Sequence, residues 1–154
     1  MMRRAIAWAT ITLAIKQYTD DAGITHIDTN QTATGGIKGT QELRQLDWIE
    51  RPHDDHIFGK LKGKNRWIAT GSPEYEAVNQ FMREGWLEEG EQAGPNGETH
   101  VQNFVVNEEK GWTAEQIWGF AIVEEKRYYV RRVVVTKGAE VLSVRLVYNW
   151  QGKE

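Results

Sequence analysis

The sequence predicts an all-β protein, built as an up-and-down antiparallel β-barrel of about eight strands with one short amphipathic helix. Apolar and polar residues alternate with a period of two along many short segments, which is typical of strands with one buried face. Short turn-forming connections separate these segments, and helical spacing occurs in a single segment, so the barrel is favoured over a fold of alternating strands and helices. With 154 residues the chain suits one domain, spanning residues 1–154.

The N-terminal third predicts a polar hairpin. Two arginines precede a short apolar run, and we expect residues 3–9 to end a helix rather than to form a secretory signal or a membrane span. Residues 10–18 and 24–34 alternate as strands around a turn at residues 20–23. The second strand carries His26 and is polar on both faces. It fits equally an edge strand in solvent or a barrel whose interior holds water and a polar ligand group.

The middle third predicts two strands, a helix and a loop. Residues 39–51 and 57–70 are expected as strands around a turn at residues 53–56, whose two histidines could bind a divalent metal. An ordinary solvated turn explains the same residues, so we expect no metal site. Residues 72–85 predict one helix, because Ser72 and Pro73 can begin it and apolar residues follow at helical spacing. An acidic, glycine-rich loop at 88–98 and a strand at 99–107 follow.

Residues 112–150 predict an antiparallel meander, around which we expect the rest of the chain to close. Residues 112–123 alternate regularly, and residues 124–126 form a polar turn. Residues 127–136 are so rich in β-branched and aromatic side chains that a strand is favoured over a helix. Lys137-Gly138 predicts a type I′ turn into a last strand at residues 139–150.

Composition excludes several functions. The formal net charge of −3 and the isoelectric point near 5.9 argue against nucleic acid as a partner. The absence of cysteine excludes disulfides and thiolate chemistry and agrees with a cytoplasmic protein. Seven tryptophans suit a thick core or the wall of a ligand cavity. No nucleophile–base pair or phosphate-binding loop is visible, so hydrolysis and phosphoryl transfer have little support, and we expect no cofactor.

Three stretches carry a resemblance to a known family: RRAIAWATITLAIKQY, GTQELRQLDWIERPHDDHIFGKLKG and VLSVRLVYNW. The chain resembles the calycin superfamily, in particular intracellular fatty-acid-binding proteins, and is similar to lipocalin-like proteins of filamentous fungi. This resemblance implies a single lipocalin-like barrel with a helical lid and a lipophilic ligand inside. Family members usually begin with one more strand and a helical lid ahead of this sequence, so we expect an open barrel seam. A homodimer closing the seam, or a shortened N-terminus, would account for it.

The family's carboxylate site pairs an inward arginine on the last strand with a tyrosine two residues later. This chain has Arg145 and then Tyr148, which a regular strand turns to opposite faces, so binding of a fatty-acid carboxylate is not expected. Another inward arginine of the family corresponds to Arg131 or Arg132, which as neighbours also point to opposite faces.

Two functions follow. The first is a carrier that binds a lipophilic small molecule inside the barrel. The alternative is an enzyme of fungal secondary metabolism, a cofactor-independent, pericyclase-like cyclase or isomerase that folds a polyene, polyketide or terpenoid in the same cavity. Catalytic candidates are His26, Tyr129 and Arg131. The expected ligand-binding residues are Trp67, Phe104, Trp118, Phe120, Tyr129, Arg131, Arg132, Arg145 and Tyr148.

Overall fold

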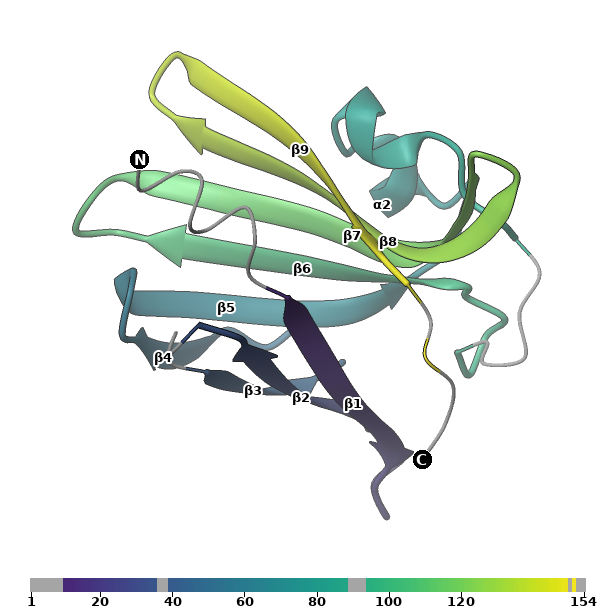
Figure 1. The fold of residues 1–154 in the computed structure, drawn as a ribbon, viewed down its shortest axis with the longest axis horizontal. Coiled ribbons are helices and arrows are strands. Elements are labelled where there is room, and N and C mark those ends of the chain that lie inside the picture. Colours follow the sequence, from purple (N-terminus) through teal and green to yellow (C-terminus); the bar gives the residue numbers. More distant parts are fainter. Residues whose placement is uncertain (1–9, 36–38, 89–93, 150, 152–154) are drawn as a thin grey trace. The chain divides into compact units, whose positions relative to one another are not determined.

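The computed structural model describes residues 10–35, 39–88, 94–149 and 151, and it confirms an all-β antiparallel protein (Figure 1). Strands pair in chain order, as β1-β2-β3 in one sheet and β4-β5-β6-β7-β8-β9 in the other. Within the described ranges no pairing closes either sheet on itself, so the closed calycin-like barrel stays a prediction. The chain divides into two compact units, Met1–Asp47 and Trp48–Glu154. None of the helices in the described part is long and apolar enough to cross a membrane.

The first unit is the predicted hairpin with one further strand. It consists of β1 (Ile11–Thr19), β2 (Thr25–Ala33) and β3 (Thr40–Gln45). The β1–β2 turn forms where predicted, because Oδ1 of Asp20 accepts hydrogen bonds from the backbone N–H groups of Ala22 and Ile24. The helical turn and the alternative secretory signal considered for residues 3–9 lie outside the described residues.

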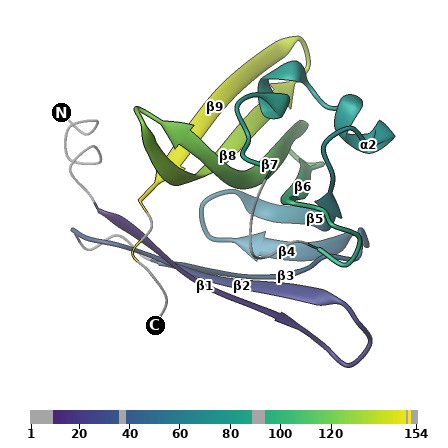
Figure 2. The same ribbon diagram turned by 90° about the vertical axis from the view of Figure 1, so that its right-hand side faces the viewer.

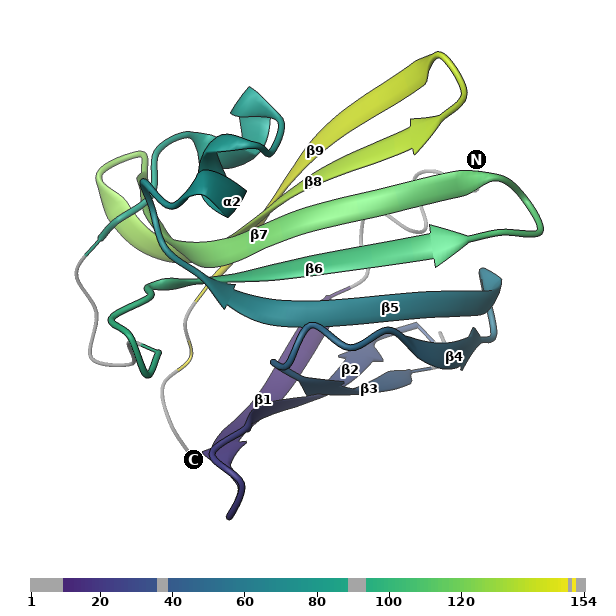
Figure 3. The same cartoon turned by 180° about the vertical axis from the view of Figure 1, so that it is seen from behind.

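The second unit is a twisted six-stranded sheet, whose strand direction turns steadily from β5 to β9 (Figure 3). Its last three strands are the predicted meander, within two residues at each boundary. The strands are β4 (Arg51–Asp55), β5 (Gly59–Ile68), β6 (His100–Asn107), β7 (Trp112–Val123), β8 (Lys126–Lys137) and β9 (Glu140–Tyr148).

The turn predicted at residues 53–56 is wrong. Residues 51–55 form β4, and the turn follows, where Oδ1 of Asp55 accepts hydrogen bonds from the backbone N–H groups of Ile57 and Phe58. Pro52 is tolerated in this strand because β4 lies at the edge of the sheet, where a missing backbone donor removes no hydrogen bond from a second neighbour. The strand predicted at 39–51 is correspondingly interrupted after β3.

The helix predicted at residues 72–85 begins where expected but is shorter, because this segment breaks into two short pieces. Ser72 caps α2 (Pro73–Glu76) as expected, accepting a hydrogen bond from the backbone N–H of Tyr75. Asn79 then adopts a non-helical backbone, with φ −55° and ψ 137°, and its side chain caps the 3₁₀ helix η1 (Gln80–Arg83). Asparagine favours such caps because its side chain competes for backbone donors.

These two pieces cover one face of the six-stranded sheet and form the main core with it (Figure 2). We call this the covered face. The β7–β8 hairpin curls toward the same segment, since the backbone N–H of Leu87 donates to the carbonyl of Phe120 and Trp86 bridges to Ala121. The buried members of the core are Ile68, Tyr75, Val78, Met82, Ile117 and Val134.

The two hairpin turns of the meander differ from the predicted ones. Val123 pairs with Lys126, so the first loop is Glu124-Glu125 alone, and both residues have positive φ, 50° and 70°. This geometry is that of a type I′ turn. Lys137 pairs with Glu140, so Gly138 is the first loop residue and has φ 59°. With positive φ at the first position only, the second loop fits a type II′ turn rather than type I′.

Candidate active site on the six-stranded sheet

The strand register gathers several predicted ligand-binding residues on the face opposite the covered one. Trp118 of β7 pairs with Arg131 of β8, and Tyr129 lies between Phe120 and Tyr148 in the next row. Paired residues of antiparallel strands share a face, so these side chains are neighbours. We call this surface the aromatic face, defined by Trp118, Phe120, Tyr129, Arg131 and Tyr148.

Arg131 lies at the centre of the aromatic face and is only 6% exposed. Its guanidinium carbon lies 4.3 Å from the centre of the Trp118 ring, and 5.5 and 5.7 Å from those of Tyr129 and Tyr148. Its Nε donates a hydrogen bond of 3.2 Å to the hydroxyl oxygen of Tyr129. A guanidinium over aromatic faces is attracted by their negative charge density. The three rings therefore hold the positive charge in a fixed place.

One nitrogen of this guanidinium is buried without a partner. Nη2 of Arg131 is buried and has no hydrogen-bond partner among the described residues. The ion pairs found between described residues do not include it. A buried donor without an acceptor costs about 1–3 kcal/mol, and more when it is charged. Nη2 is thus available to an acceptor other than those of the described residues.

Tyr148 remains a neutral phenol beside this charge. Burial raises the pKa of its hydroxyl, and the positive charge of Arg131 opposes this only in part. Its ring lies 5.8 Å from that of Tyr129, which in turn packs edge-on against Phe120 at 5.8 Å. The surroundings of Arg131 are therefore mainly aromatic, and the hydroxyl of Tyr148 among them is uncharged. Such a surface suits a lipophilic molecule with a few polar atoms.

Of the remaining predicted residues, one lies on the same sheet face and three do not. Trp67 occupies the same cross-strand row as Trp118 and Arg131, two strands away from Trp118. Phe104 lies on the covered face beside Lys64. Arg132 also lies on the covered face, where Nη1 donates to the carbonyl of Phe81 and holds η1 on the sheet. Arg145 is exposed and lies opposite Arg132 in the backbone register of β8 and β9.

His26 belongs to the first unit and is engaged there. Its Nε2 lies 2.7 Å from Oδ2 of Asp20, and its ring stacks on Tyr18 with the centres 4.8 Å apart. The hydrogen bond from His26 is the largest cause lowering the pKa of the Asp20 carboxyl. This histidine thus stabilises the end of the β1–β2 hairpin.

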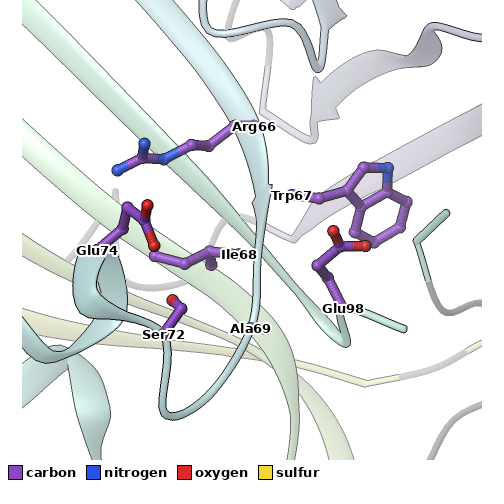
Figure 4. A pocket seen from close by; sticks show the side chains of 7 residues that line it. All are labelled: Arg66, Trp67, Ile68, Ala69, Ser72, Glu74 and Glu98. Atoms are coloured by element: carbon purple, nitrogen blue, oxygen red, sulfur yellow. The ribbon is translucent and has the colours of Figure 1, made fainter. Parts of the chain in front are cut away.

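A pocket of about 230 Å³ lies at the end of β5 (Figure 4). Arg66 and Glu74 line one side of the strand, and Trp67 and Glu98 the other. Nε of Arg66 donates to Gln102, and burial lowers the pKa of this guanidinium although Glu74 opposes the shift. The pocket is charged and smaller than typical ligand sites of 300–1,000 Å³. The aromatic face is therefore the better candidate site for a mostly apolar ligand.

Sequence reasoning missed two groups of polar residues built around buried side chains. The first is His100, 1% exposed, whose Nε2 lies 3.2 Å from Oγ1 of Thr70 and near the Glu88 carboxylate. The second is a row of amides on the aromatic face, Asn65, Asn103 and Gln116. Both groups sit in strand positions that alternate regularly, but only the register between strands shows that they meet.

Comparison with known proteins finds relatives that are named pericyclases. The chain is 31% identical to pericyclase pydY of an Acremonium species over 153 residues, which cover 99% of this chain and 78% of pydY. The chain belongs to the pericyclase pydY family. It is also 26% identical to a probable pericyclase, scpY of Mollisia scopiformis, over 155 residues, covering 100% of this chain and 77% of scpY. No protein-family model and no solved structure matches this member of the pydY family.

Proposed function

We propose that the protein is a cofactor-independent cyclase of natural-product biosynthesis that catalyses a pericyclic ring closure of a lipophilic polyene, polyketide or terpenoid. The aromatic face of the six-stranded sheet is its substrate-binding surface. The observation that carries this proposal is Arg131, a buried guanidinium stacked on Trp118 with its Nη2 free to donate. The named pericyclases among its relatives favour this enzyme over the carrier that the sequence placed first.

A pericyclic reaction demands little covalent chemistry from the protein. In a cycloaddition two σ bonds form as two π bonds are lost, with no leaving group, proton transfer or co-reactant. The barrier is set by the unlikely folded conformation of a flexible chain and by the electron demand of the reacting alkene. Holding the chain folded can supply several kcal/mol. Apolar walls such as Trp118 and Tyr148 stabilise the bound chain by burying it, at about 25 cal/mol per Å².

Arg131 supplies the electronic part. A carbonyl conjugated to the reacting alkene accepts a hydrogen bond from Nη2, and the guanidinium charge withdraws electron density from the alkene. This interaction strengthens as the carbonyl oxygen gains charge in the transition state, so it accelerates the reaction rather than only binding the substrate. Tyr129 accepts a hydrogen bond from Nε of Arg131, so Nη2 is left to donate to the substrate.

The proposal is tested with a synthetic trienone, in which a conjugated diene is tethered to an enone and closes slowly without catalyst. We expect the protein to accelerate ring closure, and Arg131→Met to lose most of the acceleration because methionine keeps bulk but cannot donate. Arg83→Met is the matched control, since Arg83 of η1 forms a partly exposed ion pair with Glu76 of α2, away from the aromatic face. A folded Arg131→Met variant as fast as the unsubstituted protein would contradict the proposal.

A further inference from the structure

Three amide side chains and one indole form a continuous hydrogen-bonded chain across the aromatic face. Nε1 of Trp118 donates to Oε1 of Gln116 at 2.8 Å, and Nε2 of Gln116 donates to Oδ1 of Asn103 at 3.4 Å. Nδ2 of Asn103 then donates to Oδ1 of Asn65 at 2.7 Å. The chain runs from β7 through β6 to β5, and its members at positions 65, 103 and 116 are paired in register.

The direction of this chain is fixed by chemistry rather than by the choice of amide orientation. An indole N–H can only donate, so Gln116 must turn its oxygen toward Trp118 and its nitrogen toward Asn103. Asn103 must then present its oxygen to Gln116 and its nitrogen to Asn65. Each amide is thus polarised in one direction, and flipping any one of them would set two like groups against each other.

The chain ends on a donor without a partner. Asn65 is 8% exposed, its side-chain oxygen is used by Asn103, and its backbone carbonyl accepts from the N–H of Trp48. The hydrogen bonds found among the described residues include none from its Nδ2, and this atom is not one of the fully buried unpaired ones, so it is accessible. The aromatic face therefore carries an unused donor on Arg131 and another on Asn65, while the amides between them satisfy one another.

We propose that Nδ2 of Asn65 binds a second hydrogen-bond acceptor of the substrate, and that Gln116 and Asn103 are positioning residues that fix Asn65 and the Trp118 ring beneath Arg131. This inference rests on the proposed use of the aromatic face as the substrate-binding surface. Asn65 is on β5 and Arg131 on β8, three strand spacings apart, which amounts to roughly 14 Å across the sheet. The substrate class is accordingly a long lipophilic chain whose two oxygen acceptors lie about this far apart while its reacting part is folded.

Binding of two probes tests the role of Asn65. The first is the trienone described above, and the second is the same chain with an additional ketone at its distal end. We expect the protein to bind the two-ketone probe about 3- to 10-fold more tightly, the usual worth of one added hydrogen bond. Asn65→Asp keeps the acceptor for Asn103 but loses the donor, so this preference should disappear at neutral pH and return as acid protonates the introduced carboxyl.

The matched control is Gln102→Glu, an amide-to-acid change on the covered face that retains the acceptor for Arg66. We expect it to leave the preference for the two-ketone probe unchanged at every pH. An Asn65→Asp variant that keeps the preference at neutral pH overturns the inference. A preference that is lost but not recovered in acid also overturns it, because the substitution would then act through the fold rather than through the donor.

The positioning role has a readout that needs no substrate. In protein labelled with ¹⁵N at tryptophan, Trp118→Phe identifies the indole N–H signal of Trp118 among the seven. We expect Gln116→Leu to speed hydrogen exchange at this N–H, and an unchanged rate would overturn the positioning role. The outcomes also separate the two proposals. Ring closure without an effect of Asn65→Asp refutes this inference alone, whereas selective binding without ring closure refutes the proposed function alone.

Discussion

Gly119 of β7 lies on the covered face, next to His100 and to Trp86 of the segment packed over that face. A Cβ at this position would lie 2.7 Å from Nδ1 of His100, and 3.1 and 3.3 Å from two ring carbons of Trp86. His100 is fully buried and cannot swing into solvent. Gly119→Ala should therefore force His100 and Trp86 away from the sheet and loosen residues 70–88.

The expected cost follows from two opposing effects. Overpacking a filled site costs about 1–3 kcal/mol. Replacing glycine by alanine restricts the unfolded chain and stabilises by about 0.4–1 kcal/mol. We predict that Gly119→Ala lowers the free energy of unfolding by about 1–2 kcal/mol, measured by urea denaturation followed by tryptophan fluorescence.

A double variant tests whether the cost of Gly119→Ala comes from the His100 contact or from any substitution in β7. His100→Ala removes the nearest contact, so Gly119→Ala should cost at least about 1 kcal/mol less in that background than alone, because residues in contact are coupled. Gly63→Ala is the matched control, since a Cβ there has no neighbour nearer than 3.7 Å. If Gly119→Ala is equally costly in both backgrounds, the argument from the His100 contact is refuted.

Three further predictions concern stability. Burial lowers the pKa of His100, although Glu88 opposes the shift, so folding favours the neutral histidine. The free energy of unfolding should therefore fall as the pH drops below about 6.5, the pKa of histidine in the unfolded chain. In denaturation curves between pH 7 and 5, His100→Asn should reduce this loss. Burial raises the pKa of Glu115, so its negative charge disfavours folding above about pH 4.3. Glu115→Gln should therefore raise the free energy of unfolding at pH 7 but not at pH 3. An equal change in the free energy of unfolding at both pH values would contradict this. Glu125 has φ 70° in a type I′ turn, so Glu125→Gly should raise the free energy of unfolding by about 1 kcal/mol, whereas Glu140→Gly in β9 should lower it.

The sequence predicted the meander well, because alternation and β-branched residues act locally. It could not decide which arginine joins the aromatic face. A three-residue turn at 124–126 would place Arg132 opposite Trp118, whereas the actual two-residue loop places Arg131 there. A register shift of one residue moves every following side chain of the strand to the opposite face of the sheet.

The break in the helical segment and the buried polar contacts could not be predicted, because they depend on residues far apart in the sequence. Nothing local marks Asn79 as the residue that divides the predicted helix, since its competing cap is worth only about 1 kcal/mol. His100 and the amides Asn65, Asn103 and Gln116 occupy ordinary strand positions. Their roles arise from pairing between strands up to 51 residues apart, from position 65 to position 116 through position 103.

The central claim is that Nη2 of Arg131 donates to a carbonyl of the reacting substrate. The most direct test compares ring closure of the trienone with that of its allylic alcohol, which lacks the carbonyl, in the unsubstituted protein and in Arg131→Met. We predict that the protein accelerates the ketone far more than the alcohol, and that Arg131→Met reduces the two to similar, weak acceleration. An undiminished preference for the ketone in the folded variant would contradict the account.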